Sequence, residues 1–418
     1  MIFFHPDCGS LEKSRIVTVH FDTRDPLLAR ILGRSRSLFA GDVAANAARL
    51  KAAIGGARIL IVGAAGSIGA AFVKQLAIFN PAALHLVDIN ENDLVELVRD
   101  LRSSSLNLPA DFCTVTADFA GPEFLHYAQE NAPYDVLANF SALKHVRAER
   151  DVYSLARMIE INIAALDRCL SQSSALGLKR AFSVSTDKCV RPANLMGASK
   201  NLMEKVLFSR GENFVATSAR FANVAFSAGS LLEGFENRLA KGQPLAGPSD
   251  VKRYFISHEE AAQLCLLACF LGEDRQVFFP KLSEKKDLLG FPDIAAAILA
   301  ARGMKPLPCA SEDEARQAVR TANSSQWPCY FAPSDTSGEK AVEEFYRHDD
   351  VLDLDSFTAA GIALEKPADR RTLEAFLAAI ETARAKPKWQ RDDFVVAVAA
   401  AVPELAHIPG HRNLDQKM

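Results

Sequence analysis

The sequence lacks the features that mark secreted, membrane-spanning or metal-binding proteins. No apolar run approaches the roughly 18–20 residues that a membrane-spanning helix requires. Residues 1–10 contain His, Asp and Gly where a signal peptide needs a long apolar stretch. No two of the eight cysteines form a C-x-x-C pair, so their spacing indicates neither a zinc site nor a disulfide framework. We therefore expect free thiols, no metal, and a reducing, cytoplasmic location.

An excess of basic residues is also absent. The 48 Lys and Arg residues face 51 Asp and Glu residues, which leaves a net charge of −3. This balance argues against general nucleic-acid binding, which requires a basic excess, but it allows a local basic pocket for a phosphorylated small molecule. The hydrophobic content of 49% is ample for a core, and 418 residues leave room for a large α/β unit with additions or for two domains.

Short apolar runs alternate with helical patterns from residue 58 onward. This alternation predicts an α/β fold, a Rossmann-type doubly wound parallel sheet with right-handed crossovers. Strands are expected at 58–62, 84–87, 135–140, 180–185 and 214–221, and helices at 26–32, 43–54, 70–79, 91–101, 153–176, 194–210 and 259–271. The segment 310–350 is polar and irregular in pattern, and a final helix is expected at 373–383. The expected divisions are a helical N-terminal extension (1–57), the Rossmann domain (58–224), a smaller interleaved region (225–300) and a C-terminal extension (301–418).

A glycine-rich turn joins the first of these strands to the helix that follows it. Gly63, Gly66 and Gly69 form the pattern G-x-x-G-x-x-G, which also includes Ser67 and Ile68. Glycines allow the tight turn and the close approach of a pyrophosphate, and the helix N-terminus offers free N–H groups and partial positive charge to the anion. These five residues are therefore predicted to bind a dinucleotide.

An acidic residue at the end of the second strand indicates which dinucleotide it is. Asp88 stands 19 residues after Gly69, where a carboxylate accepts the ribose hydroxyls of NAD. The next residues, Ile-Asn-Glu, offer no cation for the 2′-phosphate of NADP, so NAD is favoured. The other interpretation of Asp88 is a helix cap. Asp118, followed by Phe119, comes after a third strand and either contacts the adenine or simply forms a turn.

A polar stretch leaves the end of a later strand, at the sheet edge where open α/β folds bind ligands. This stretch is Ser183-Val-Ser-Thr-Asp-Lys188. Lys200 follows on a helix, and Met196 lies one turn earlier on the same face of that helix.

These residues resemble the extended short-chain dehydrogenase/reductase superfamily, in which a Tyr-x-x-x-Lys pair lies beside a Ser or Thr from the preceding strand. Met196 stands in the place of the tyrosine. The sequences STDKC (185–189) and PANLMGASK (192–200) are similar to a variant found in UDP-N-acetylglucosamine 4,6-dehydratases of bacterial polysaccharide biosynthesis. Further matches are ALKHV (142–146), RFAN (220–223), GSLL (229–232) and VKRYF (251–255), and the resemblance extends over about residues 30–282.

The resemblance implies an internal redox dehydration in which NAD takes a hydride from carbon 4 of the sugar and returns it to carbon 6. Asp187 would then be the acid for the departing hydroxyl, Lys188 the base at carbon 5, and Thr186 a hydrogen-bond partner of the carbon-4 oxygen. Lys200 would bind the nicotinamide ribose. Met196 cannot exchange a proton, because a thioether is only a weak acceptor, and its other interpretation is core packing.

The resemblance also implies several binding residues. Ser141 and Ala142 would contact the cofactor, and Lys144 would face the nicotinamide or the sugar. Asn223 and Arg253 would hold the diphosphate and uridine of a UDP-sugar, because the planar fork of arginine suits phosphate oxygens, and the region 225–300 is expected to bind the substrate. The alternative for Arg253 is a solvated surface charge.

Two other functions stay open at this point. A 4-epimerase on the same scaffold would return the hydride to carbon 4, although it would have no leaving hydroxyl for Asp187 to protonate. The missing tyrosine also suggests a catalytically silent NAD-binding scaffold. Relatives suggest a homo-oligomer, a dimer or larger, and residues 301–418 are expected to form a lid or an interface.

Overall fold

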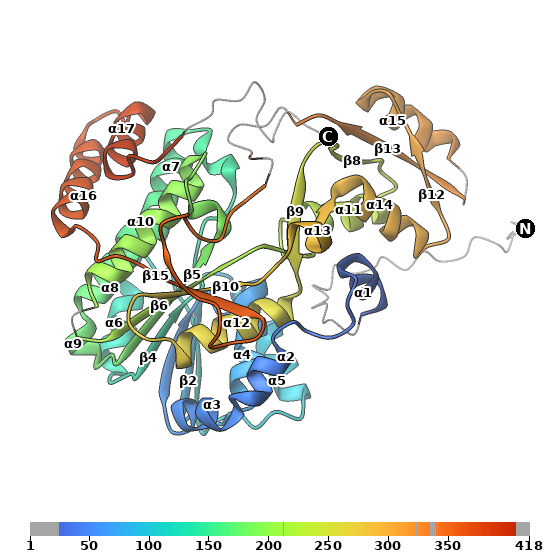
Figure 1. The fold of residues 1–418 in the computed structure, drawn as a ribbon. Coiled ribbons are helices and arrows are strands. Elements are labelled where there is room, and N and C mark those ends of the chain that lie inside the picture. Colours follow the sequence, from blue (N-terminus) through green and yellow to red (C-terminus); the bar gives the residue numbers. More distant parts are fainter. Residues whose placement is uncertain (1–24, 212, 323–324, 335–339, 341, 407–418) are drawn as a thin grey trace, which may run out of the picture.

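The computed structural model describes residues 25–211, 213–322, 325–334, 340 and 342–406. A large central sheet dominates this part of the chain (Figure 1). Its strands are β1 (Arg58–Val62), β2 (Ala83–Asp88), β3 (Asp111–Thr116), β4 (Val136–Asn139), β5 (Arg180–Thr186), β6 (Val215–Phe221), β10 (Gln276–Pro280), β14 (Val351–Asp353) and β15 (Ala360–Leu364).

The strand order of this sheet is β14-β15-β10-β6-β5-β4-β1-β2-β3. The seven strands from β10 to β3 pair in parallel, whereas β15 and β14 are antiparallel additions at one edge. The order reverses between β1 and β4, and a crevice forms at the carboxyl ends of the strands on either side of such a switch point. The prediction of a Rossmann-type doubly wound α/β sheet is confirmed.

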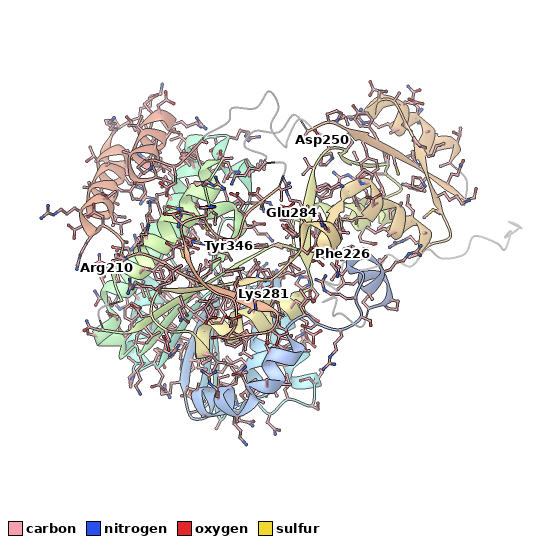
Figure 2. All side chains as sticks on the ribbon, viewed as in Figure 1. Arg210, Phe226, Asp250, Lys281, Glu284 and Tyr346 are labelled. Atoms are coloured by element: carbon pink, nitrogen blue, oxygen red, sulfur yellow. The ribbon has the colours of Figure 1, made fainter. Side chains whose placement is uncertain are left out.

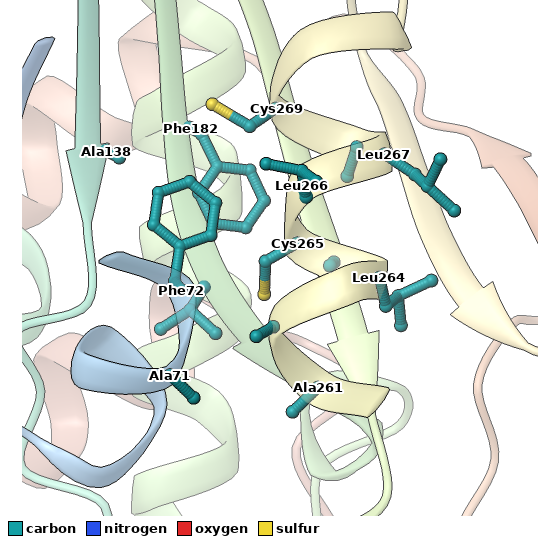
Figure 3. Packing of buried hydrophobic residues seen from close by; sticks show 14 of the residues in the cluster. Ala71, Phe72, Ala138, Phe182, Ala261, Leu264, Cys265, Leu266, Leu267 and Cys269 are labelled. Carbon is teal, nitrogen blue, oxygen red and sulfur yellow. The ribbon is translucent and has the colours of Figure 1, made fainter. Parts of the chain in front are cut away.

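One face of the sheet is covered by a layer of helices that contribute to a single apolar cluster. They are α2 (Ala40–Ala45), α3 (Ala47–Ile54), α4 (Ser67–Ala77), α5 (Glu91–Ser103) and α12 (His258–Leu271). Figure 3 shows Phe72 of α4 and Phe182 of β5 beside Cys265 and Cys269 of α12, and the two rings stack with centroids 6.5 Å apart. This dry packing holds α4, which follows the glycine-rich turn, firmly against the sheet.

The opposite face is covered by a second layer of helices around another apolar cluster. They are α6 (Pro122–Glu130), α7 (Val152–Ile159), α8 (Ala165–Ser171), α9 (Ser173–Leu176), α10 (Leu195–Ser209), α16 (Arg370–Ala385) and α17 (Arg391–Ala401). Figure 1 shows α16 and α17 lying outside α7 and α10. The C-terminal region therefore covers the back of α10, the helix that carries Met196 and Lys200.

A smaller lobe with its own apolar cluster stands beside the carboxyl edge of the sheet (Figure 1). Its elements are α1 (Pro26–Leu32), β7 (Asn223–Val224), α11 (Leu231–Ala240), β8 (Leu245–Pro248), β9 (Lys252–Ile256), α13 (Glu284–Asp287), β11 (Leu288–Gly290), α14 (Phe291–Ala300), β12 (Lys305–Pro308), α15 (Glu312–Ala318) and β13 (Gln326–Ala332). After β13 the chain returns to the main sheet, where Tyr346 (labelled in Figure 2) packs on Phe279 of β10 with ring centroids 4.9 Å apart.

The N-terminal residues take part in both lobes. Helix α1 packs against α14 of the smaller lobe. The carboxylate of Asp42, at the start of α2, accepts hydrogen bonds from the backbone N–H groups of Thr358 and Ala359 just before β15, at 2.6 and 2.8 Å. Two segments more than 300 residues apart in the sequence are thereby joined.

Several expected helix boundaries are wrong. The helix expected at 43–54 breaks at Asn46, and the long helix expected at 153–176 contains a π-helical turn at 160–164 and ends at Ser171 before the short α9. In the π-helical turn, Asn162 donates to the backbone of Leu143 at 3.0 Å and accepts from it at 2.9 Å. A π-helical turn changes the direction in which a side chain such as that of Asn162 points, and hydrophobic periodicity does not reveal this change.

The expected irregularity of 310–350 is wrong for part of this segment, and the helix expected at 373–383 is present within α16 but is not the last helix. Residues 312–318 form α15, and 326–332 form β13, which pairs in parallel with β8 and β12. Helix α17 follows α16 near the C-terminal end of the described chain. A sequence signal for α15 was present, because Ser311 caps its N-terminus and accepts a hydrogen bond from the N–H of Glu314.

No helix among the described residues has the length and apolar character needed to cross a membrane.

Candidate active site

The glycine-rich turn between β1 and α4 has no room for side chains at two of its three glycines. Gly63 has a φ of +71°, and a Cβ there would lie 2.6 Å from the backbone nitrogen of Ser141, beyond β4. A Cβ on Gly69 would lie 2.2 Å from the carbonyl oxygen of Gly63, whereas one on Gly66 would meet that oxygen at 3.4 Å. Gly66 also begins α4 without a side-chain cap. The turn therefore presents bare backbone and a helix N-terminus at the crevice between β1 and β4.

The other two residues of this turn have different contacts. Ser67 Oγ accepts a hydrogen bond from the backbone N–H of Ala228 at 3.0 Å, so the loop that precedes α11 lies against the glycine-rich turn. Ile68 is half-buried and packs on the core beneath α4. A loop of the smaller lobe thus borders the crevice, which sequence reasoning did not anticipate.

Asp88, at the end of β2, is hydrogen-bonded to the glycine-rich turn. Its carboxylate is buried and accepts hydrogen bonds from the N–H groups of Ala65, at 2.9 Å, and Asn90, at 3.0 Å. Asn90, rather than Asp88, is the residue that caps α5. The helix-cap interpretation of Asp88 is therefore excluded, and its carboxylate lies next to the turn, where a ribose would be bound.

The contacts of Asp118 are those of a turn residue. One carboxylate oxygen accepts a hydrogen bond from the N–H of Ala120 at 3.0 Å, and the other pairs with Arg157 at 2.5 Å. Phe119 is buried, and its ring packs edge-on against Phe124 with centroids 4.9 Å apart. The Phe119 ring is therefore committed to the core, and any contact of this segment with an adenine would involve its backbone or the outer edge of Asp118.

Ser141 and Ala142 lie directly beyond the end of β4. Asn139 accepts a hydrogen bond from the N–H of Ser141 at 3.0 Å and donates to Ser183 Oγ at 3.1 Å. Because Ser141 also adjoins Gly63, these half-buried residues form one wall of the crevice between β1 and β4.

The next two residues, Lys144 and His145, face the smaller lobe. Both side chains reach solvent, yet desolvation by the surrounding protein lowers the pKa of each. A nearby Glu233 partly opposes the shift for Lys144, whereas Lys144 and Arg147 add to it for His145. Gly229 packs closely on the His145 ring, since a Cβ there would lie 2.6 Å from Nε2. His145 thus supports the loop that borders the crevice.

The Thr-Asp-Lys stretch forms one hydrogen-bonded chain at the carboxyl end of β5. Thr186 Oγ1 and Lys188 Nζ both donate to Asp187 Oδ1, each at 2.9 Å. Lys188 Nζ also donates to Asn223 Oδ1, at 3.1 Å, on β7. The Asp187 carboxylate is buried, whereas 22% of the Lys188 side chain is exposed. The structure therefore brings together Thr186, Asp187, Lys188 and Asn223, which the sequence separated by up to 37 residues.

Helix α10 places Lys200 against β5, next to the hydrogen-bonded chain of Thr186, Asp187 and Lys188. Lys200 is buried and donates from Nζ to the carbonyl of Val184 in β5 at 2.9 Å. Burial lowers the pKa of Lys200 to about 8, while Cys189 and Glu204 act in the opposite direction. Its ammonium group is therefore held against β5, where burial makes it easier to deprotonate than an exposed lysine.

Met196 is buried in the apolar cluster beneath α10. Its backbone N–H donates to Glu149 Oε1 at 2.9 Å, and its carbonyl accepts from Ser199 Oγ at 2.7 Å. The core-packing interpretation of Met196 is the one that these contacts favour.

Arg253 is buried, so the interpretation as a solvated surface charge is wrong. Its Nη1 donates to the carbonyls of Lys252 and Lys340, each at 2.9 Å. The arginine therefore joins β9 to a segment 87 residues later. A diphosphate would have to share this guanidinium with those backbone carbonyls.

Sequence reasoning missed one group near the Thr-Asp-Lys chain. Glu343 is buried, and the charges of Asp187, Lys188, Lys340 and Arg253 all act on it. No local pattern marked Glu343, because it comes from the segment that the sequence suggested to be irregular. Only the return of the chain from the smaller lobe brings it to this place.

Comparisons with known proteins agree with this arrangement. Residues 59–320 match the family described as Polysaccharide biosynthesis protein. The chain is 34% identical over 240 residues to an uncharacterized membrane protein of Methanocaldococcus jannaschii, covering 55% of this chain and 69% of that protein. It is 26% identical over 240 residues to a Campylobacter jejuni protein named UDP-N-acetylglucosamine 4,6-dehydratase (inverting), with the same coverage of the two chains.

Some relatives are much longer than the matched part. The capsular polysaccharide biosynthesis protein CapD of Staphylococcus aureus is 29% identical over 252 residues, which is 59% of this chain and 41% of CapD. Among solved structures, DesIV of Streptomyces venezuelae, described as a dTDP-glucose 4,6-dehydratase with NAD bound, superposes with a TM-score of 0.52 at 19% identity. That superposition covers 69% of this chain and 88% of DesIV and supports the fold. Because the family match spans more than half of the sequence, the chain belongs to the polysaccharide biosynthesis protein family.

Proposed function

We propose that the protein is an NAD-dependent nucleotide-sugar 4,6-dehydratase, a lyase, and that its substrate is UDP-N-acetylglucosamine. The observation that carries the proposal is the hydrogen-bonded chain of Thr186, Asp187, Lys188 and Asn223 at the carboxyl edge of the sheet, beside the glycine-rich turn. The relative named UDP-N-acetylglucosamine 4,6-dehydratase supports both the reaction and the substrate. The product would be a UDP-4-keto-6-deoxy-N-acetylhexosamine for polysaccharide biosynthesis.

The residues around the glycine-rich turn suit NAD. A side chain at Gly63 or Gly69 would fill the space that the glycine-rich turn leaves beside its backbone, and the uncapped start of α4 suits a pyrophosphate. Asp88 would accept the ribose hydroxyls, and its carboxylate would repel the 2′-phosphate of NADP. Lys200 would contribute a cation near the nicotinamide ribose. When bound, NAD would supply the hydride chemistry, accepting a hydride from carbon 4 and returning it to carbon 6.

The hydrogen bonds of Asp187 suggest a route for one proton. Dehydration takes a proton from the carbon-4 hydroxyl and delivers one to the departing carbon-6 hydroxyl, which leaves as water. Thr186 donates to Asp187, so a carbon-4 hydroxyl bonded to Thr186 could pass its proton through that hydroxyl to the carboxylate. Asp187 would then be the acid at carbon 6. This route uses no group on Met196, which cannot exchange a proton.

Lys188 would serve as the base at carbon 5, where the carbon-4 ketone acidifies the hydrogen. Proton transfers of this kind contribute typically about 10²–10⁴-fold to a rate. Asn223, which accepts a hydrogen bond from Lys188, would hold the ammonium side chain in place and contact the nucleotide sugar. The remaining proposed contacts are Ser141 and Ala142 to the cofactor and Lys144 and Arg253 to the substrate.

Mass spectrometry of UDP-N-acetylglucosamine after incubation with the purified protein tests this proposal. Loss of one water molecule would support it, whereas unchanged mass with a new stereoisomer would indicate a 4-epimerase. No change at all would contradict both functions.

Two variants test the residue assignments. Asp187→Asn should stop the loss of water and should also strongly reduce the enzyme-bound NADH seen by its absorbance, because the proposed route then leaves the carbon-4 proton without an acceptor. Lys188→Ala should also abolish exchange of the carbon-5 hydrogen with deuterated solvent. Full exchange in Lys188→Ala would mean that another group is the base.

Cofactor preference tests the role of Asp88. Calorimetry should show NAD binding at least about tenfold more tightly than NADP, which is about 1.4 kcal/mol. Tighter binding of NADP would contradict the assignment.

A further inference from the structure

A cavity of about 300 Å³ lies on the side of α10 that faces α16 and α17 (Figure 1). It is bounded by residues 365–369, by the first turn of α16 and by the last turn of α17. None of the described residues that line it belongs to the glycine-rich turn or to the Thr-Asp-Lys stretch. Lys200 points from the same helix toward β5 instead. The cavity is therefore separate from the proposed catalytic residues.

Part of the cavity wall is apolar. Phe208 of α10 and Leu373 of α16 line it, together with Pro367, Ala400 and Pro403. Pockets for organic molecules combine apolar walls of this kind with a few convergent polar groups. The apolar wall therefore suits the body of an organic molecule, and the polar side chains of the cavity indicate which charged group that molecule would carry.

The carboxylates that line the cavity already accept hydrogen bonds. The two oxygens of Glu204 accept from the buried Arg220, at 2.9 and 2.5 Å. Glu365 accepts from Arg220 through one oxygen and from Arg347 through both, at 3.0 and 3.3 Å. The oxygens of Asp369 accept from groups in the first turn of α16, at 3.0 and 2.7 Å. Each oxygen of these three carboxylates therefore has a donor within the protein.

Two cations that line the cavity, by contrast, keep unused donors. Lys205 Nζ makes one hydrogen bond among the described residues, to the carbonyl of Ala401 at 3.0 Å. Arg347 donates to Glu365 from Nη1, and its Nη2 makes no hydrogen bond within the part of the chain that the structure describes. Glu404 Oε1 lies 3.8 Å from Lys205 Nζ and 4.0 Å from Arg347 Nη2, beyond hydrogen-bond distance of both. The cavity therefore has donors in excess of acceptors.

The surroundings of Lys205 favour a bound anion. Desolvation lowers the pKa of Lys205, Glu404 and two other carboxylates oppose that shift, and Arg347 adds to it. An anion between Lys205 and Arg347 would replace the lost hydration with charge-assisted hydrogen bonds. A phosphate monoester carries about −1.5 to −2 charges at pH 7 and offers three acceptor oxygens, which matches two neighbouring cations with unused N–H groups. A carboxylate would bring only one charge.

We propose that this cavity is a second ligand site, which binds a small organic phosphate between Lys205 and Arg347. Lys205 Nζ and Arg347 Nη2 would donate to the phosphate oxygens, and the organic body would lie against Phe208 and Leu373. Asn201, which also lines the cavity, has a buried Oδ1 without a hydrogen-bond partner among the described residues. The site lies outside the residues of the proposed reaction and does not depend on that function.

Calorimetry with phenyl phosphate near neutral pH tests this proposal, because that probe joins a phosphate to an apolar ring. Wild-type protein should bind it at least about tenfold more tightly than benzyl alcohol, which has the ring without the charge. Lys205→Met should weaken the binding of phenyl phosphate about tenfold or more, the usual loss for a charge-assisted hydrogen bond. Lys179→Met is the matched control, because it removes an exposed lysine that pairs with Asp135, and it should bind phenyl phosphate as the wild type does.

Amine labelling of the wild-type protein locates the bound probe without any substitution. The side chain of Lys205 is 29% exposed, so acetic anhydride can reach its amine. Phenyl phosphate should slow the acetylation of Lys205, measured by mass spectrometry, and leave that of Lys179 unchanged. Benzyl alcohol should protect neither lysine.

Three results would overturn the inference. They are equal binding of phenyl phosphate by Lys205→Met and wild type, acetylation of Lys205 that phenyl phosphate does not slow, and binding of benzoate as tight as that of phenyl phosphate, which would contradict the phosphate assignment. The test uses neither NAD nor a nucleotide sugar. Its failure is therefore distinct from a failure of the proposed dehydratase function.

Discussion

Replacing Lys200 with methionine should make the ligand-free protein at least as stable as the wild type near neutral pH. The wild-type ammonium is buried, and its pKa falls from 10.5 to about 8. At about 1.4 kcal/mol per pKa unit, the charged form costs the fold about 3 kcal/mol. Methionine removes that cost but leaves the Val184 carbonyl without its donor, a loss of about 1–3 kcal/mol. Lys200→Met should therefore be between equal to the wild type and about 2 kcal/mol more stable at pH 7.

The pH dependence of this difference is the sharper test. Between pH 8 and 10.5 the unfolded chain keeps the Lys200 proton and the folded chain does not, so wild-type stability rises with pH in that interval. The slope from this one group is about 1.4 kcal/mol per pH unit. Urea unfolding at pH 7, 8, 9 and 10 should show the wild type gaining on Lys200→Met above pH 8.

A control separates this effect from general alkaline changes. Lys179 is an exposed lysine at the surface, and Lys179→Met should follow the wild-type pH profile. A difference between Lys200→Met and wild type that is flat from pH 7 to 10 would refute the reasoning. Lys200→Met should also lose NAD in calorimetry, because the proposed cofactor contact requires the cation.

Two further predictions concern the glycine-rich turn and the C-terminal helices. Gly69→Ala should abolish NAD binding, because its Cβ would lie 2.2 Å from the Gly63 carbonyl oxygen. Gly66→Ala, whose Cβ would lie 3.4 Å from the same oxygen, should keep most of the NAD binding. Calorimetry compares the two variants, and equal NAD binding would contradict the steric argument. Glu160→Gln should cost about 3 kcal/mol in urea unfolding, because it breaks a largely buried ion pair with Arg384 that fixes α16 to the π-helical turn. The pKa of Glu160 is lowered, so wild-type stability should fall, and this difference should shrink, as acid protonates the carboxylate.

Periodicity and turn chemistry were sufficient to predict the central architecture. The first strand was predicted at its observed bounds, 58–62, and the other expected strands of the parallel sheet lie within a residue or two of their predicted ends. The glycine-rich turn was recognisable from its local pattern. The crowding at Gly69, against the Gly63 carbonyl oxygen, is a property of the local chain path, whereas the crowding at Gly63 comes from the distant Ser141. Asp187 and Lys188 are adjacent in the sequence, so their pairing needed no long-range contact. The π-helical turn at 160–164 escaped prediction, because its Asn162 side chain bonds to the backbone of another segment, at Leu143.

Tertiary structure alone decided which distant groups complete the site. Burial of Arg253 depends on the carbonyl of Lys340, which lies 87 residues further along the chain. Glu343 lies near enough for the charges of Asp187 and Lys188 to act on it only because the polypeptide crosses to the smaller lobe and returns. Strand and helix periods report which face of a local element is apolar, but they carry no information on which remote segment covers it. The sequence by itself therefore determined the sheet, the glycine-rich turn and the Asp187–Lys188 pair. Only folding decided that Glu343 and Arg253 are buried near them.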